Sequence, residues 1–194
     1  MAIDFADTYY LGEAFKRGAF RPRVAGYAEM EDEILREHHR GQRRPVRPLR
    51  LEWAEGSCLM DFTGTTAVLP NVVSQRLVDV LRENGVTGWS TFPIELYGKN
   101  GELIEGYHGL AVTGRCGALQ LGRSRVETRI GASGKPYKIK IGLFFDESTW
   151  DGSEMFVPED TAHVFVIGKV KRLLEQAKIS NVTFTPLNTL ERQW

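Results

Sequence analysis

The chain has 194 residues, of which 42% are hydrophobic and 26% are charged, as is typical of a globular protein. Its 25 basic and 25 acidic residues give a formal net charge of zero, so no overall field would hold it on nucleic acid or a membrane surface. It lacks the run of about 18 apolar residues that a membrane span requires, and Met1–Asp7 does not resemble a secretory signal. We therefore expect one compact, cytoplasmic unit without a membrane partner.

Residues 1–50 are predicted to form an irregular, partly helical N-terminal segment. A polar helix is expected from Tyr27 to His38, because acids precede bases along it and so complement the helix dipole. The following connector, Arg36–Arg50, holds six arginines against one acid. We interpret it as a solvated connector. The alternative is an arm that contacts phosphates, although aromatic residues that could stack on bases are absent from it.

Residues 49–194 are predicted to form an α+β domain. Leu49–Trp53 alternates as a strand does, and Cys58–Phe62 is a short apolar run typical of a second strand. Beyond Leu69, apolar residues recur at helical spacing. Asn71 or Ser74 would cap this helix, and Asn84-Gly85 would end it.

Two hairpins are predicted next. Trp89–Tyr97 and Leu103–Val112 flank an Asn-Gly pair, which favours a tight turn because both residues tolerate positive φ. Arg125–Ile130 would pair with Tyr137–Phe145 around a glycine-containing turn. The fold class is therefore α+β, with a mainly antiparallel sheet of hairpins packed by two or three helices.

A helix-turn-strand unit occurs twice, at about 69–97 and 163–188. A gapless overlay matches Val73 with Val166, Leu77 with Val170, Val80 with Leu173, Leu81 with Leu174, Val86 with Ile179, Pro93 with Pro186 and Ile94 with Leu187. Any amphipathic helix followed by a strand would match in part, but amphipathicity does not require the shared Pro-aliphatic pair. Two copies are too few for a solenoid, so we expect related positions in one compact fold.

Candidates for chemistry are few. Cys58 and Cys116 lie apart in predicted strands and are interpreted as buried free thiols in a reducing cytosol. His38 and His39 end a polar helix, where we expect exposure, while His108 and His163 are interpreted as structural. The common phosphate-loop, serine-nucleophile, zinc and dinucleotide motifs are absent. We therefore predict no enzyme activity, cofactor or metal.

One segment has a composition that suits a protein interface. Residues 146–160 contain six acids and no base, at a spacing that fails the EF-hand pattern. Aromatic side chains anchor interfaces, and acidic neighbours steer a basic partner. The alternative is a solvated loop whose tryptophan packs on its own sheet. The predicted partner-binding residues are Asp146, Glu147, Trp150, Asp151, Glu154 and Phe156.

The C-terminal run Phe165-Val166, Leu173-Leu174, Ile179, Phe184 and Pro186-Leu187 resembles the ending of a family of bacterial immunity proteins encoded beside polymorphic toxins, formerly a domain of unknown function. In that family a strand, a helix and a closing aromatic-x-Pro-aliphatic strand end the chain. The resemblance covers about residues 49–187. The related myxobacterial double-CXXCG proteins carry paired CxxCG motifs, which this sequence lacks.

The resemblance implies a non-enzymatic inhibitor that binds and neutralises one cognate protein toxin in the cytosol. The alternative function is a nucleic-acid-associated protein that uses the arginines of Arg36–Arg50 against phosphates. The sequence does not favour nucleic-acid binding, since the bases are local and lack stacking partners. It leaves a homo-oligomer open.

Overall fold

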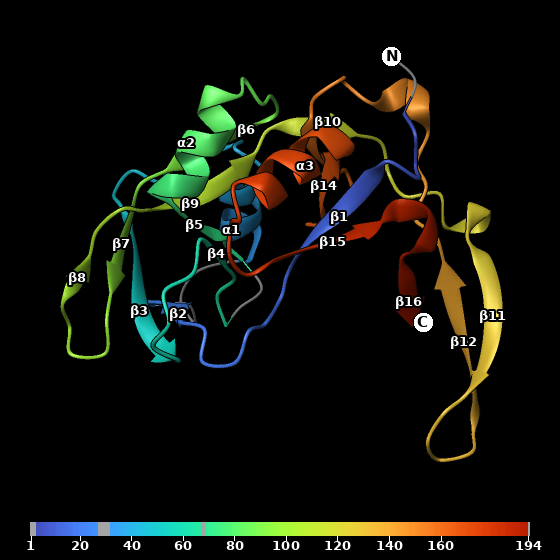
Figure 1. The fold of residues 1–194 in the computed structure, drawn as a ribbon, viewed down its shortest axis with the longest axis horizontal. Helices are drawn as coiled ribbons and strands as arrows, with labels where there is room; N and C mark the ends of the chain where they lie inside the picture. Colours follow the sequence, from blue (N-terminus) through green and yellow to red (C-terminus); the bar gives the residue numbers. More distant parts are fainter. Residues whose placement is uncertain (1–2, 27–31, 67–68, 194) are drawn as a thin grey trace.

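The computed structural model describes residues 3–26, 32–66 and 69–193 (Figure 1). Within them lie three α-helices: α1 (Asp32–His39), α2 (Gln75–Glu83) and α3 (Gly168–Gln176). The strands form four small sheets, in which only β3 with β7 and β10 with β13 pair in parallel among the described strands. This confirms the α+β prediction.

Two four-stranded sheets occupy one end of the molecule (Figure 1). The first has the order β2 (Arg21–Val24), β3 (Leu49–Glu55), β7 (Ile94–Tyr97), β8 (Leu103–Ile104). The second has the order β4 (Phe62–Thr63), β5 (Val72–Ser74), β9 (Tyr107–Val112), β6 (Trp89–Phe92).

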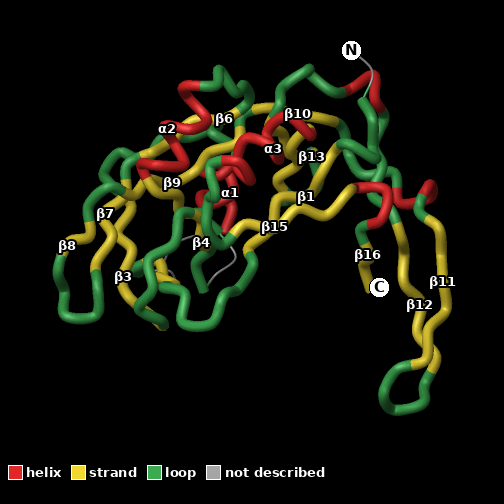
Figure 2. Tube along the Cα trace, in the orientation of Figure 1, coloured by secondary structure: helices red, strands yellow, loops and turns green. Residues whose placement is uncertain are grey.

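A five-stranded and a three-stranded sheet complete the fold. The first has the order β10 (Gly114–Cys116), β13 (Met155–Pro158), β14 (Val164–Ile167), β1 (Thr8–Glu13), β15 (Val182–Pro186). The second has the order β11 (Arg125–Ile130), β12 (Pro136–Ile141), β16 (Glu191–Gln193). Strands β11 and β12 project from the body of the molecule (Figure 2).

The N-terminal segment differs from its prediction. Instead of being irregular it contributes β1, which lies between β14 and β15, and β2. Of the helix expected from Tyr27 to His38, residues 27–31 lie outside the described residues, and the rest forms α1.

The other predicted elements form with shifted bounds. The expected strand Cys58–Phe62 is replaced by an isolated bridge between Cys58 and Ala19, and β4 begins only at Phe62. The first predicted hairpin is divided between two sheets, since β6 pairs with β9 and β7 with β8. The second hairpin is confirmed, although β12 ends at Ile141, before Gly142 adopts a φ of +89°.

Helix α2 shows how local sequence sets an element. The Ser74 side chain accepts a hydrogen bond from Leu77 N at 3.2 Å and so satisfies one free N–H of the first turn. Leu77 and Leu81 face the core with exposed fractions of 2% or less. Gly85, at a φ of +61°, reverses the chain. Both predicted helix boundaries are thus confirmed.

Helices α2 and α3 each connect two strands that lie on either side of a third strand. Strands β5 and β6, joined by α2, flank β9, and both Val72 and Phe92 pair with Gly109. Strands β14 and β15, joined by α3, flank β1. The overlay of the two units predicts the residues equivalent to Val72 and Phe92 to be Phe165 and Thr185, and both of these pair with Tyr10. The strand registers therefore agree with the gapless overlay.

The overlay also holds one strand further upstream. In the first copy, β4 pairs with β5 through Phe62 and Val73. In the second copy, β13 pairs with β14 through Met155 and Val166. Each copy therefore consists of a strand, a second strand, a helix and a closing strand. In the sheet, a strand from elsewhere in the chain lies between the second strand and the closing strand.

A polar cluster joins the two copies at Asp61. Its carboxylate accepts hydrogen bonds from Arg76 at 3.0 Å and from Ser74 Oγ at 2.8 Å in its own copy. From the other copy it accepts the backbone N–H and hydroxyl of Ser180, at 2.9 and 2.8 Å. In return, Asp61 N donates to Ser180 Oγ, and Arg76 donates to the carbonyl of Ala177.

A second cluster repeats this pattern with the copies exchanged. Glu154 pairs with Lys169 of its own copy at 2.8 Å and accepts the Thr87 backbone N–H of the other copy at 3.2 Å. Glu154 N donates to Thr87 Oγ1 at 3.1 Å, and Lys169 donates to the carbonyl of Asn84 at 3.4 Å.

The members of the two clusters occupy equivalent positions. The overlay matches Asp61 with Glu154, Arg76 with Lys169, Ser180 with Thr87 and Ala177 with Asn84. Carboxylate thus replaces carboxylate, base replaces base and hydroxyl replaces hydroxyl. Because each copy supplies the hydroxyl residue that bonds the acidic residue of the other, the copies are related as the halves of a two-fold dimer are.

The core consists of three clusters of buried side chains. The largest combines residues of both copies, among them Leu81 and Leu174, and α2 lies against α3. The second cluster lies around β3 and β7, and the third around Phe145, Phe156 and Phe165. Among the described residues, none of the helices combines the length and apolarity that crossing a membrane would demand.

Candidate functional site

Residues 146–160, here called the acidic loop, begin five residues beyond the last residue of β12, but they are not a loop throughout as expected, since Met155–Pro158 form the buried strand β13. Asp146, Glu147 and Asp151 are exposed. Asp146 Oδ1 accepts hydrogen bonds from Ser148 Oγ at 2.7 Å and Ser148 N at 3.0 Å, and these bonds hold the pKa of Asp146 below its usual value. Asp151 accepts the backbone N–H of Arg115 at 2.8 Å. These contacts fix the shape of the loop.

The other three predicted partner-binding residues are held by the protein itself. Trp150 is half-buried, donates to the Ser153 carbonyl at 3.0 Å and lies 5.8 Å from the Phe156 ring. Glu154 belongs to the polar cluster with Lys169. Phe156 is fully buried in the third core cluster and presents no surface to a partner. The alternative interpretation, in which Trp150 packs on its own protein, describes this ring well.

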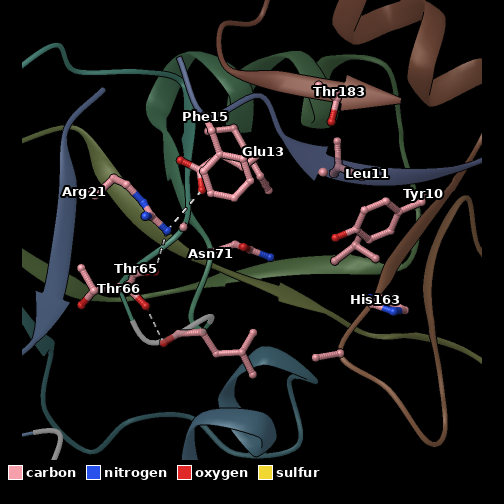
Figure 3. Close-up of a pocket in the computed structure, with 16 residues that line it drawn as sticks. Tyr10, Leu11, Glu13, Phe15, Arg21, Thr65, Thr66, Asn71, His163 and Thr183 are labelled. Atoms are coloured by element: carbon pink, nitrogen blue, oxygen red, sulfur yellow. Dashed lines mark hydrogen bonds and ion pairs between the residues drawn. The ribbon is translucent and has the colours of Figure 1, made fainter. Parts of the chain in front are cut away.

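A separate cavity of about 370 Å³ opens beside β1 (Figure 3). It is lined by β1, by the segments that lead into β5 and β14, and by Arg21 of β2. Arg21 Nη2 lies 3.8 Å from Glu13 Oε2 and donates to the carbonyl of Thr65 at 3.3 Å. The charges of Arg21 and Glu13 thus face one another at the cavity.

Phe15 stands at the rim of this cavity with 65% of its surface exposed. Its φ of +49° is uncommon for a bulky residue, and the Arg21 guanidinium lies 5.1 Å from the centre of its ring. Exposed aromatic and arginine side chains often anchor interfaces. Sequence reasoning missed this pair because neither the positive φ nor the exposure follows from local composition.

The histidines are placed as structural residues. His38 and His39 are buried, contrary to the exposure expected for them, because α1 packs against the rest of the protein. His38 Nδ1 lies 2.8 Å from the Arg43 carbonyl and His108 Nε2 lies 2.7 Å from Gln75 Oε1. The His163 ring meets the Tyr10 ring edge-on at 5.1 Å.

The two cysteines differ in their surroundings. Cys116 is buried as expected, and its burial raises the pKa of its thiol to about 12. Cys58 is exposed, which corrects the prediction, because it follows β3 in a surface segment that forms only a single bridge. In the described part of the chain, no group of three or more His, Cys, Asp or Glu side chains is arranged to hold a metal ion.

The arginine-rich connector is partly tied to the protein. The Arg40 guanidinium donates to the carbonyls of Pro158, Glu159 and Thr161 at 2.6 to 2.9 Å. Arg43 pairs with Glu37 at 3.3 Å. Arg50 pairs with Glu52 at 3.1 Å. These internal contacts compete with the phosphate contacts that the alternative function would need.

The family model for the immunity protein family Imm11 matches residues 22–189 of this chain. The match spans most of the chain, including both copies, the acidic loop and the hairpin of β11 and β12. The chain therefore belongs to the Imm11 immunity protein family. No curated protein sequence matches it.

Proposed function

We propose that this protein neutralises one cognate toxin in the bacterial cytosol by binding it, without catalysing a reaction. Membership of the Imm11 immunity protein family is the observation that carries the proposal. Three of the four histidines make hydrogen bonds to carbonyl or amide oxygens.

The acidic loop is the proposed contact surface. Its exposed carboxylates, Asp146, Glu147 and Asp151, would attract a basic toxin surface, and the edge of Trp150 would add apolar contact. Because the loop is already held by its own hydrogen bonds, little conformational entropy would be lost on binding. Glu154 supports the loop from within, and Phe156 is left out of the surface because it is buried.

The test uses the toxin domain encoded by the neighbouring gene. Cells that express this domain should grow only when the wild-type protein is co-expressed. The double variant Glu147→Lys with Asp151→Lys should weaken binding of the purified domain by about tenfold or more, because it reverses two charges at the contact. Trp150→Ala should also weaken it. Binding is measured by calorimetry with a catalytically inactive toxin domain.

The control is Glu105→Lys, which reverses one carboxylate, half of the charge change of the double variant, at an exposed position before β9. It should bind like the wild type. Well-folded wild-type protein that neither binds the toxin domain nor restores growth would contradict the proposed function. Normal binding by the loop variants would contradict only the proposed surface.

A further inference from the structure

The hairpin of β11 and β12 is built as an arm. Its two strands pair over six residues each, and β16 adds to the other edge of β12. The arm projects from the body of the molecule (Figures 1 and 2), and none of its residues belongs to the three core clusters of the described chain. Its shape is therefore not set by these clusters, although Ile139 and Ile141 of β12 are buried.

The two faces of the hairpin differ in chemistry. Side chains alternate between the faces along each strand. On one face, Glu127 pairs with Arg125 at 3.0 Å, and Arg129 makes two hydrogen bonds to Glu191, at 2.6 and 2.8 Å. Ile139, opposite Glu127, is buried. The charges of this face are thus neutralised within the protein.

The opposite face, here called the open face, has no acidic residue. It consists of Val126, Thr128, Ile130, Pro136, Lys138 and Lys140. Val126 is 53% exposed and Ile130 is 69% exposed, although branched aliphatic side chains gain free energy when they leave water. Lys138 is exposed between them. Two exposed aliphatic side chains beside Lys138, on a face without an acid, would suit contact with a partner that is apolar and acidic.

The charge of the arm favours one kind of partner. Of the five basic residues in 125–141, Arg125 and Arg129 are paired on the neutralised face and Lys135 lies in the turn, so the open face carries Lys140 and the exposed Lys138. The one acid of this range, Glu127, lies on the neutralised face. A partner that covers the open face therefore has to supply both apolar contact and negative charge.

We propose that the open face of this hairpin docks on an acidic, partly apolar surface of the cognate toxin. The inference rests on the proposed function and adds a second contact to the acidic loop. The two surfaces would therefore contact separate parts of the toxin. Because the two contacts carry opposite charges, they would fix the orientation in which the toxin binds.

The experiment measures binding of the inactive toxin domain to the full-length protein and its variants. Val126→Ser combined with Ile130→Ser should raise Kd by about tenfold or more, because it removes the apolar contact. Lys138→Glu should raise Kd and also make the complex less sensitive to salt, because an attraction is replaced by a repulsion. Both changes lie at exposed positions, so circular dichroism should match the wild type.

The hairpin of β7 and β8 provides matched controls at a different exposed turn. Leu103→Ser removes a side chain that is also 53% exposed, and Lys99→Glu reverses an exposed charge. Both should leave Kd within about twofold of the wild-type value.

The outcomes separate the two proposals. If the wild type binds the toxin domain and the open-face variants bind equally well, the hairpin inference is overturned and the proposed function stands. If the open-face variants change only self-association, measured by light scattering, the inference is overturned as well. If the wild type does not bind the toxin domain, the proposed function fails and the hairpin inference fails with it.

Discussion

At the scale of single residues, His39 shows the largest effect of burial on a histidine. Its ring is fully buried, with Nε2 3.1 Å from the Ala162 carbonyl. Burial lowers the pKa of His39 to about 4. The hydrogen bond to Ala162 opposes this shift, whereas the charges of Arg40 and Arg115 add to it. The ring is therefore neutral in the folded protein at neutral pH.

This burial predicts a dependence of stability on pH. The unfolded chain takes up a proton on His39 near pH 6.5, but the folded protein does so only near pH 4. The contribution of the neutral, buried His39 ring to stability is complete above pH 6.5 and is lost as the pH falls toward 4. When the pH is lowered from 7.5 to 5.5, protonation of His39 in the unfolded chain should lower the free energy of unfolding by about 1 kcal/mol.

The measurement is urea denaturation at the two pH values. His39→Gln, whose amide can still donate to Ala162, should show a smaller loss of stability on acidification than the wild type does. Equal losses in the two proteins would contradict this account of His39.

The burial of His38 and His39 also shows what sequence reasoning lacks at this scale. The polar composition of α1 predicts an exposed helix end, but composition describes only the helix itself. What covers the helix end is remote in the chain, since the Ala162 carbonyl meets His39 and the Phe92 ring lies 5.7 Å from the His38 ring. Only the tertiary fold brings these groups together.

At the scale of elements, the two polar clusters should differ in their contribution to stability. Burial of Asp61 opposes its ionisation, but hydrogen bonds from Ser180 and Ser74 and the charge of Arg76 outweigh this effect and lower its pKa. Its side chain is 12% exposed. Glu154 is nearly as buried, at 17% exposed, and the bases Arg76 and Lys169 are similarly exposed, at 54% and 45%, so solvent screens the two ion pairs alike. The clusters differ in their other bonds, since Asp61 also accepts from Ser74 and twice from Ser180, whereas Glu154 accepts, within the described chain, only the Thr87 N–H besides Lys169.

We predict that Asp61→Ala lowers the free energy of unfolding by about 3 kcal/mol, because it leaves several donors unpaired. Glu154→Ala should cost about 1 kcal/mol. The double exchange of Arg76→Lys with Lys169→Arg should cost less than Asp61→Ala, since each position receives the base of its equivalent. Urea denaturation at pH 7.5 measures all three. Equal losses for the two alanine variants would contradict the ranking.

Local sequence predicts some elements well and others not at all. The structure confirms α2 and the hairpin of β11 and β12, which local signals predict. These signals are the capping serine before α2, the glycine after it and the turn residues between β11 and β12. Strand β1 was missed because its partners, β14 and β15, come at the far end of the chain. The division of β6 from β7 falls at Pro93, which has no N–H to continue a ladder.

The candidate site could be predicted only in part. A run of acids indicates an exposed segment, and Asp146, Glu147 and Asp151 are exposed. The same run includes Phe156, whose burial depends on packing against Phe145 and Phe165. Sequence reasoning did not recognise the open face of the hairpin. The alternation of polar and apolar residues predicts that one face of a hairpin is solvent-exposed, but not that aliphatic side chains on that face stay exposed.

At the scale of the whole molecule, the shared core predicts one cooperative unit. The largest cluster needs Leu81 from one copy and Leu174 from the other, so neither copy can bury its apolar residues alone. Three tryptophans report on the three clusters separately. Trp89 packs on the first cluster, Trp53 on the second and Trp150 on the third.

Variants that keep one of these tryptophans, with every other tryptophan changed to phenylalanine, should therefore unfold in urea with coincident fluorescence and circular dichroism transitions. A reporter whose fluorescence changes at lower urea than the circular dichroism does would contradict a single unit and identify the cluster that separates first.

The exchanged hydroxyls of the two polar clusters are the contacts expected if two copies of one short ancestral chain had first met as separate molecules. After fusion into a single chain, the sequence of each copy can change independently of the other. The segment between β10 and β13 contains the hairpin and the loop, whereas the equivalent position before β4 holds α1 and β3. A symmetric pair would offer each surface twice, but this chain offers each once, so its stoichiometry with a toxin should be one to one.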